Sequence, residues 1–260
     1  MAGIDKNKGV AVIKLGGSFL TDKSMPFKAR VDSIKKVADA LRGFEGSIAI
    51  VHGGGSFGHS VAMKYGLSSS KNFSDSEAIF ETRKAMHKLS SIVTSSFEES
   101  GLKTYTLPAA GLLRKDKRPR ADLQSILNNI MKAKMIPLTF GDVIPYRDSF
   151  TIVSGDYLSY VLCSRLRAEK MCFLIDRPGI LMDPADENSI IRRLTGMEIK
   201  SIRYDNAHDA TGGLKAKLLA ALKIAELGVQ TAILSGFNTD ALISFLAGGK
   251  VQGTVVKPQG

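Results

Sequence analysis

The sequence predicts an α/β fold, a three-layer α/β/α sandwich with a central, mostly parallel sheet. Two observations support this. Short β-branched runs alternate with longer helical stretches along the 260 residues. Most of these runs are apolar nearly throughout, as expected for strands that helices cover on both faces. A β-α-β-α order then implies parallel strands joined by helical crossovers.

The strand pattern occurs in segments spread over the whole chain. In order they are 9–15, 47–52, 103–108, 135–140, 170–175 and 229–235. The segment 141–153 predicts a hairpin at an edge. Residues 176–190 are rich in turn-forming residues and predict a loop.

Helical patterns fill the intervals between these strands. We expect helices over 28–43, 75–99, 121–134, 155–168 and 213–227. In the first, Val31, Ile34 and Ala38 belong to an apolar stripe at helical spacing. The last consists of strong helix formers throughout. No internal repeat or linker is evident, so we expect a single domain over 1–260.

The composition of the chain indicates its cellular compartment and argues against a membrane partner. No apolar run approaches the roughly 20 residues that a membrane helix needs, and the N-terminus has no apolar signal core. We therefore expect a cytoplasmic protein without a membrane partner. The two cysteines, Cys163 and Cys172, form no disulfide or zinc pattern, and we expect both to be buried and reduced.

The formal net charge of +11 favours an anionic partner. Nucleic acid is one class, but the densest basic run, 114–120, has no interleaved aromatic residues and no named binding motif. We therefore expect no nucleic-acid partner. Small ligands that carry several phosphates remain.

Glycine clusters follow the first two strands and precede the last predicted helix. They are Gly16-Gly17-Ser18 after Lys14, the run 52–59 (HGGGSFGH), and the run 209–217 (DATGGLKAK). Glycine lets backbone amides approach an anion closely, and a helix N-terminus adds a favourable dipole. Because ligands of open parallel sheets collect at the carboxyl ends of the strands, the clusters predict a polyphosphate ligand there.

Several phosphate-binding classes do not fit. GGGSFG matches the dinucleotide motif GxGxxG, but it follows the second strand and lacks an acidic strand-end residue about twenty positions on. The P-loop motif GxxxxGK[ST] is absent, as are the HRD and DFG triplets of protein kinases.

The motifs KLGGS, TDK, VHGGGSFGH, GDV, SGD and DATGG-x3-K occur in this order from Lys14 to Lys217. This series resembles the isopentenyl phosphate kinase family, which has the amino acid kinase fold. Each motif is weak alone, but the ordered set is specific and covers essentially the whole chain. The closing His59 is the most telling residue, because it distinguishes this family from most of its relatives. The resemblance implies an ATP-dependent kinase of a small phosphorylated substrate and a homodimer.

The resemblance also implies residue roles at the nucleotide. Lys14 and Lys23 would hold the phosphates and stabilise the phosphoryl group in transfer, and Asp156 would orient the active-site lysines. The other residues implied at the ATP site are Gly16, Gly17, Ser18, Gly55, Asp176, Gly213 and Lys217. ATP would bring Mg²⁺, and we expect no metal site in the protein itself. The nucleotide lobe would span about 151–260, and the acceptor lobe about 1–150.

At the acceptor, the resemblance implies a hydrogen bond from His59 to the existing phosphate. The other residues expected there are Gly54, Gly155, Ile79, Thr82 and Arg83. The chain departs from the family in having Ile79 at a usually aromatic position, SGDY in place of SGDD, IDRPG in place of TDVDG, and Ser235-Gly236 where Asn-Gly is usual.

Two acceptors remain open. Arg83 beside Thr82 offers the charge that a carboxylate needs, which slightly favours mevalonate 3-phosphate, phosphorylated at its 5-hydroxyl. The alternative is isopentenyl phosphate, with an apolar pocket from Ile79, Phe80 and Met86. Its phosphate oxygen is already ionised and needs no base, which weighs against our preference. A non-catalytic nucleotide- or oxyanion-binding protein on the same fold is a remoter alternative.

Overall fold

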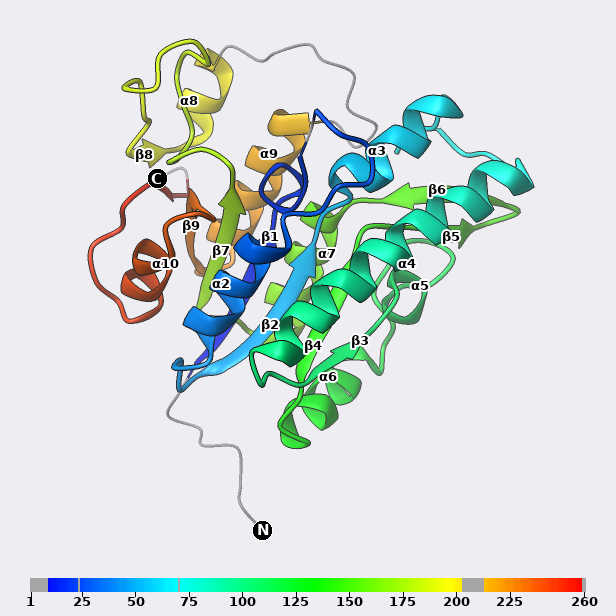
Figure 1. Cartoon of the computed structure of the whole chain (residues 1–260), viewed down its shortest axis with the longest axis horizontal. Helices are drawn as coiled ribbons and strands as arrows, with labels where there is room; N and C mark the ends of the chain where they lie inside the picture. The colour runs from blue at the N-terminus through cyan, green and yellow to red at the C-terminus, as the bar shows by residue number, and fades with distance from the viewer. Residues whose placement is uncertain (1–8, 23, 70, 203–212, 259–260) are drawn as a thin grey trace.

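The computed structural model describes residues 9–22, 24–69, 71–202 and 213–258 (Figure 1). The predicted site residue Lys23 and the DATG part of the last glycine cluster lie outside these residues. Within the described part of the chain, no helix is long and apolar enough to cross a membrane.

One eight-stranded sheet runs through the molecule in the order β3-β4-β2-β1-β7-β9-β10-β8. β1 pairs in parallel with β2 and with β7, whereas β10 runs antiparallel to β9. The mostly parallel sheet was predicted. Its strands are β1 (Val10–Leu15), β2 (Ser47–His52), β3 (Thr104–Thr106), β4 (Ile136–Phe140), β7 (Lys170–Ile175), β8 (Arg193–Leu194), β9 (Gln230–Ser235) and β10 (Thr254–Val256).

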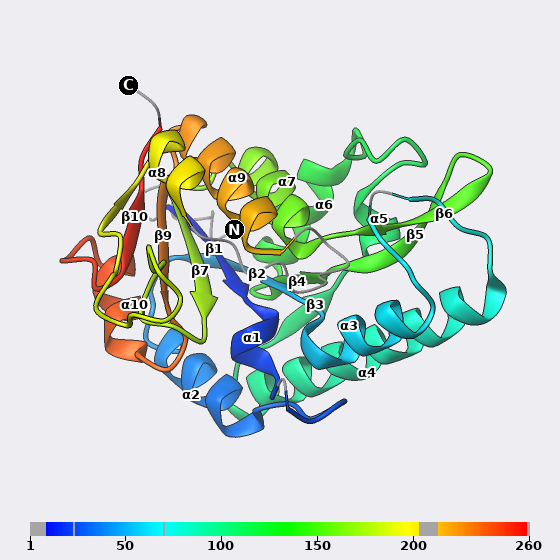
Figure 2. The same ribbon diagram turned by 90° about the horizontal axis from the view of Figure 1, so that it is seen from above.

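Helices cover both faces of this sheet (Figure 2). One apolar cluster joins alternate sheet residues, such as Ile13, to α2 (Val31–Leu41), α4 (Ser76–Glu99) and α10 (Thr239–Leu246). Another joins the opposite residues, such as Val12, to α6 (Leu123–Lys132), α7 (Gly155–Leu166) and α9 (Gly213–Glu226). Side chains alternate across a strand, so β1, β2, β7 and β9 each supply both clusters. The three-layer architecture is therefore confirmed.

The hairpin of β5 (Asp142–Tyr146) and β6 (Ser149–Val153) forms a separate two-stranded sheet and is not part of the main sheet's edge. Several short elements were not predicted. They are α1 (Gly17–Leu20), α3 (Gly55–Lys64), α5 (Ala109–Leu112), α8 (Gly196–Ser201), α10, β8 and β10. α3 was missed because Gly55 and Gly58 are poor helix formers. Burial of Phe57 against Leu89 of α4 stabilises it.

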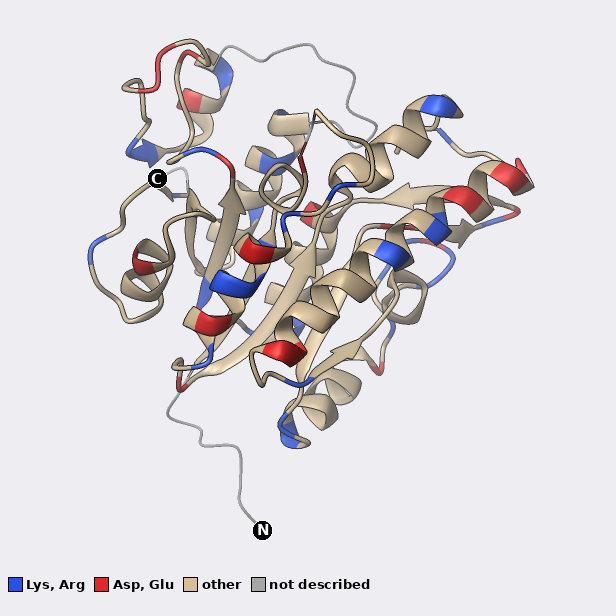
Figure 3. Ribbon diagram, in the orientation of Figure 1, with Lys and Arg blue, Asp and Glu red and all other residues tan. Residues whose placement is uncertain are grey.

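Both cysteines are buried and free, as predicted. Lys and Arg are distributed over many elements, with Asp and Glu among them (Figure 3). In the basic run 114–120, Asp116 lies 3.7 Å from Arg114 and 3.6 Å from Arg118. The charge of this run is therefore partly compensated within the run itself.

Candidate active site

The first two glycine loops interlock at the carboxyl edge of the sheet, where β1 and β2 end side by side. A β-carbon at position 17 would lie 2.5 Å from the nitrogen of Gly55, and one at position 53 would lie 2.9 Å from the nitrogen of Gly17. Any side chain at these positions would push the loops apart. Glycine is therefore required for the close approach itself.

Unpaired backbone amides lie in these loops. In the described part of the chain, the N–H groups of Gly17, Ser18, Gly54 and Gly55 donate no hydrogen bond to the protein. Gly54 and Gly55 begin α3, where the first N–H groups have no partner within the helix. Gly55 has a φ of +47°, which other residues rarely adopt. Together, the two loops offer donors to anionic oxygens.

Three charged side chains meet beside these loops. Asp156, in the first turn of α7, pairs with Lys14 of β1, and Lys217 of α9 lies 3.6 Å from the same carboxylate oxygen. The exposed fractions of the side chains are 4% for Lys14, 10% for Asp156 and 17% for Lys217. Because a single carboxylate lies beside two lysines, the cluster of Lys14, Lys217 and Asp156 carries an excess positive charge, which suits the binding of phosphate.

Burial and mutual charge shift the pKa values of this group. Burial lowers the pKa of Lys14 to about 7, opposed by Asp156 and assisted by the charge of Lys217. Burial alone would raise the pKa of Asp156, but Lys14 and Lys217 together hold it below its usual value. The carboxylate therefore stays ionised, while Lys14 titrates near neutrality.

The pH dependence of turnover should report Lys14. Its ammonium is charged below a pKa of about 7 and loses its proton as the pH rises. We therefore expect kcat/KM for ATP, which follows the free enzyme, to fall as the pH rises through about 7. Bound phosphates favour the charged lysine, so the fall in kcat should occur at higher pH. A Lys14→Arg variant that is active and retains the falling limb in kcat/KM would contradict this assignment.

Two lysines on α9 provide a test position and its control for substitution. Lys217 reaches Asp156, whereas Lys215 is exposed on the same helix. We expect Lys217→Ala to lower kcat/KM for ATP by roughly ten- to a hundredfold, because it removes a cation from the expected phosphate site. Lys215→Ala should change it less than about twofold, since solitary surface charges contribute little. Equal effects in steady-state assays of the two variants would rule out a specific role for Lys217.

The predicted glycine and histidine positions lie at the same edge. A β-carbon on Gly155 would lie 3.0 Å from the carbonyl oxygen of His52 and 3.3 Å from Cε of Lys14, so a side chain at this position would crowd both groups. His59 is half-buried in α3, four residues after Gly55 and hence on the same helix face. Asp176 directly follows β7, and Gly213, with a φ of +60°, begins α9. The structure thus brings these predicted site residues to one edge of the sheet.

The apolar residues of α4, the predicted acceptor helix, differ in whether they face the interior of the protein. Ile79 packs beside Val143 and Ile152 of the hairpin. Met86 is buried, and its sulfur lies 3.2 Å from the β-carbon position of Gly54. Phe80, by contrast, is 58% exposed. Including Phe80 in the apolar pocket was therefore wrong, because it lies on the outer face of the helix.

The polar residues of α4 contact a buried acid. Arg83 lies 3.6 Å from Asp142, whose side chain has no exposed surface. Burial raises the pKa of Asp142, and Arg83 opposes this shift. Thr82 is also buried, and its hydroxyl has no hydrogen-bond partner among the described residues. Asp142 belongs to the GDV motif, but the sequence did not predict it as the partner of Arg83.

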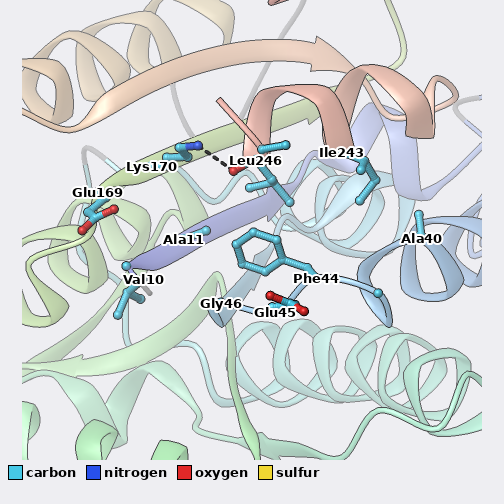
Figure 4. Close-up of a pocket in the computed structure, with 13 residues that line it drawn as sticks. Val10, Ala11, Ala40, Phe44, Glu45, Gly46, Glu169, Lys170, Ile243 and Leu246 are labelled. Carbon is cyan, nitrogen blue, oxygen red and sulfur yellow. Dashed lines mark hydrogen bonds between the residues drawn. The ribbon is translucent and has the colours of Figure 1, made fainter. Parts of the chain in front are cut away.

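A separate hollow of about 450 Å³ lies at the opposite, amino-terminal end of β1 (Figure 4). Val10, Phe44 and Lys170 are among its lining residues. Lys170 donates a hydrogen bond of 2.5 Å to the carbonyl of Leu246, at the end of α10. None of the predicted site residues lines this hollow, so it is distinct from the glycine-loop site.

Comparison with known proteins agrees with this geometry. The model of the amino acid kinase family matches residues 9–235. The isopentenyl phosphate kinase of Thermoplasma acidophilum is 30% identical over 249 residues, which cover 95% of this chain and 99% of that protein. The chain belongs to the isopentenyl phosphate kinase family of amino acid kinases. It is an ATP-dependent phosphotransferase.

A second relative and a solved structure support the same family assignment. The isopentenyl phosphate kinase of Methanocaldococcus jannaschii is 30% identical over 235 residues, covering 80% of this chain and 85% of that protein. The crystal structure of a T. acidophilum isopentenyl phosphate kinase product complex superposes with a TM-score of 0.78 at 25% identity, covering 95% of this chain and all of that one. The family and fold expected from the ordered motifs are thereby confirmed.

Proposed function

We propose that this kinase transfers the γ-phosphoryl group of ATP to isopentenyl phosphate and forms isopentenyl diphosphate. The supporting observation is the 30% identity to an isopentenyl phosphate kinase over 95% of the chain. The preference for mevalonate 3-phosphate drawn from the sequence receives no support from the comparisons, which favour the alternative acceptor instead.

The acceptor side of the site supports the same choice. The preference for a carboxylate acceptor depended on a free Arg83, but Asp142 already compensates its charge. Ile79 lies among apolar neighbours, which suits a hydrocarbon tail. An ionised phosphate oxygen can also attack without a general base, whereas a hydroxyl acceptor must lose its proton.

The proposed transfer moves one phosphoryl group between two oxygens. An oxygen of isopentenyl phosphate forms a bond to the γ-phosphorus of ATP, the bond to the bridging oxygen breaks, and ADP leaves. Such transfers have loose transition states, so the protein contributes mainly position and positive charge. We assign the charge to Lys14, Lys23 and Lys217, with Asp156 orienting Lys14 and Lys217.

The backbone and the remaining side chains would hold the two ligands. Gly17, Ser18 and Gly55 would donate amides to the ATP phosphates, with Asp176 and Gly213 at the nucleotide. The amide of Gly16 bonds the carbonyl of Leu174, so Gly16 would hold the turn beside the phosphates and not donate to them. Gly54, Gly155 and His59 would hold the acceptor phosphate, and Ile79 and Thr82 would line its tail. Mg²⁺ carried with ATP would neutralise phosphate charge. The homodimer and the cytoplasmic setting stay predictions.

A parallel acceptor assay tests the proposal. Purified protein, ATP and Mg²⁺ are mixed with isopentenyl phosphate, mevalonate 3-phosphate or mevalonate 5-phosphate, and ADP is followed. We expect kcat/KM for isopentenyl phosphate to exceed the other two by at least about a hundredfold, the discrimination worth roughly 3 kcal/mol. A preference for either mevalonate phosphate would overturn the proposed acceptor. Nucleotide binding without ADP formation from any acceptor would favour the non-catalytic alternative.

A further inference from the structure

Thr21 lies buried between the two interlocked glycine loops. Its hydroxyl donates a hydrogen bond of 2.9 Å to the carbonyl of Gly17 and accepts one of 2.8 Å from the amide of Ser56. One hydroxyl therefore joins the loop after β1 to the start of α3. Thr21 belongs to the TDK motif, but the family resemblance implies no role for it.

The surroundings of Thr21 leave little freedom for another arrangement. A β-carbon at Gly55 would lie 2.2 Å from Oγ1 of Thr21, so the hydroxyl occupies the space that a side chain there would need. Ser56 is itself buried, and its amide is one of the first N–H groups of α3. Without the hydroxyl, this buried donor would lose its partner, which is costly in a protein interior.

The bond at Ser56 also bears on which amides remain available. Thr21 pairs the amide of Ser56, while those of Gly54 and Gly55 stay unpaired within the described residues. On the other loop, the carbonyl of Gly17 is bonded and its amide is not. We call the two hydrogen bonds of the Thr21 hydroxyl, to Gly17 and from Ser56, the clamp. The clamp fixes the backbone of both loops and leaves unpaired the amides that we assign to the two ligands.

We propose that Thr21 is a positioning residue that sets the distance between the ATP phosphates and the acceptor phosphate. The inference rests on the proposed function, in which the first loop together with Gly55 holds ATP, and Gly54 at the start of the second loop holds the acceptor phosphate. In-line transfer depends on the separation of donor and acceptor, and a misplacement of about 1 Å can cost about a hundredfold in rate. Loss of the clamp should therefore lower kcat more than it weakens the binding of either substrate.

Thr21→Val tests this inference, because it keeps the shape and removes the hydroxyl. We expect kcat to fall roughly ten- to a hundredfold while both KM values change less than about threefold. Thr21→Ser, which keeps the hydroxyl, should recover most of the wild-type kcat. The matched control is Thr139→Val, since Thr139 is also buried but its hydroxyl has no partner in the described structure. This control should keep the wild-type kcat.

The inference fails if folded Thr21→Val turns over like wild type, or if Thr21→Ser is impaired as severely as Thr21→Val. Where valine prevents folding, Thr21→Ala removes the hydroxyl without adding a methyl group at its place. Hydrogen–deuterium exchange over residues 53–58 gives a readout that needs no acceptor. Exchange should be faster in Thr21→Val than in Thr139→Val, and equal exchange would contradict the clamp. Absence of wild-type turnover with isopentenyl phosphate would instead refute the proposed function alone.

Discussion

A Lys14→Met variant is expected to lose about 10²- to 10³-fold in kcat, the effect typical of removing one group that stabilises transition-state charge. Among the site cations that the structure describes, Lys14 is the most deeply buried, and it pairs directly with Asp156. Methionine fills similar space without a charge. Steady-state kinetics with saturating ATP and isopentenyl phosphate would measure the loss, and Lys35→Met, on the exposed face of α2, should retain full activity.

The same substitution has a structural effect that must be separated from the catalytic one. Removing one partner of a buried ion pair can destabilise a fold by about 3–5 kcal/mol, because the remaining charge stays buried. In this protein Lys217 remains near Asp156 and should reduce that cost. The double variant Lys14→Met/Asp156→Asn removes both charges, so we expect it to recover stability in thermal unfolding while remaining inactive. Recovery of kcat in the double variant would show that Lys14 acts only through folding.

Gly17→Ala should be nearly as damaging, by about a hundredfold in kcat. The new methyl group would lie 2.5 Å from the nitrogen and 2.7 Å from the Cα of Gly55, and both atoms belong to backbone that cannot rotate away. The loops must separate, which moves the amides that we assign to the two ligands.

Gly111→Ala is the control for this substitution. A β-carbon at Gly111 meets no atom within 4 Å, so alanine should leave both kcat and thermal stability close to wild type. Gly17→Ala should lower kcat even at saturating substrate, because the geometry of transfer is altered along with binding. Wild-type kcat in the Gly17→Ala variant would contradict the interlocking of the loops.

The sequence was sufficient to predict the core of the fold. β2 and β7 have the predicted ends, and the other predicted strands differ by one or two residues at one or both ends. Most of these strands are continuous apolar runs bounded by glycine or polar residues, which is the clearest local signal of a buried parallel sheet. β8 and β10 were missed because they span two and three residues and depend on pairing with each other and with β9.

The ordered motifs were sufficient to predict which residues share the active edge, but not how they contact one another. That Lys14 and Lys217 share Asp156 depends on the packing of α7 against α9, which no local pattern encodes. Thr21 was missed for a similar reason, because its partner Ser56 lies on the other loop. Arg83 was assigned to the substrate because its partner Asp142 comes from the distant hairpin.

The identity of the product tests the central claim most directly. Wild-type protein is incubated with ATP, Mg²⁺ and isopentenyl phosphate, and the mixture is followed by ³¹P NMR. We expect the phosphate-monoester signal of isopentenyl phosphate to be replaced by the two coupled signals of a diphosphate ester. One molecule of ADP should form for each molecule of diphosphate ester. ADP that accumulates while the isopentenyl phosphate signal persists would contradict transfer to this acceptor.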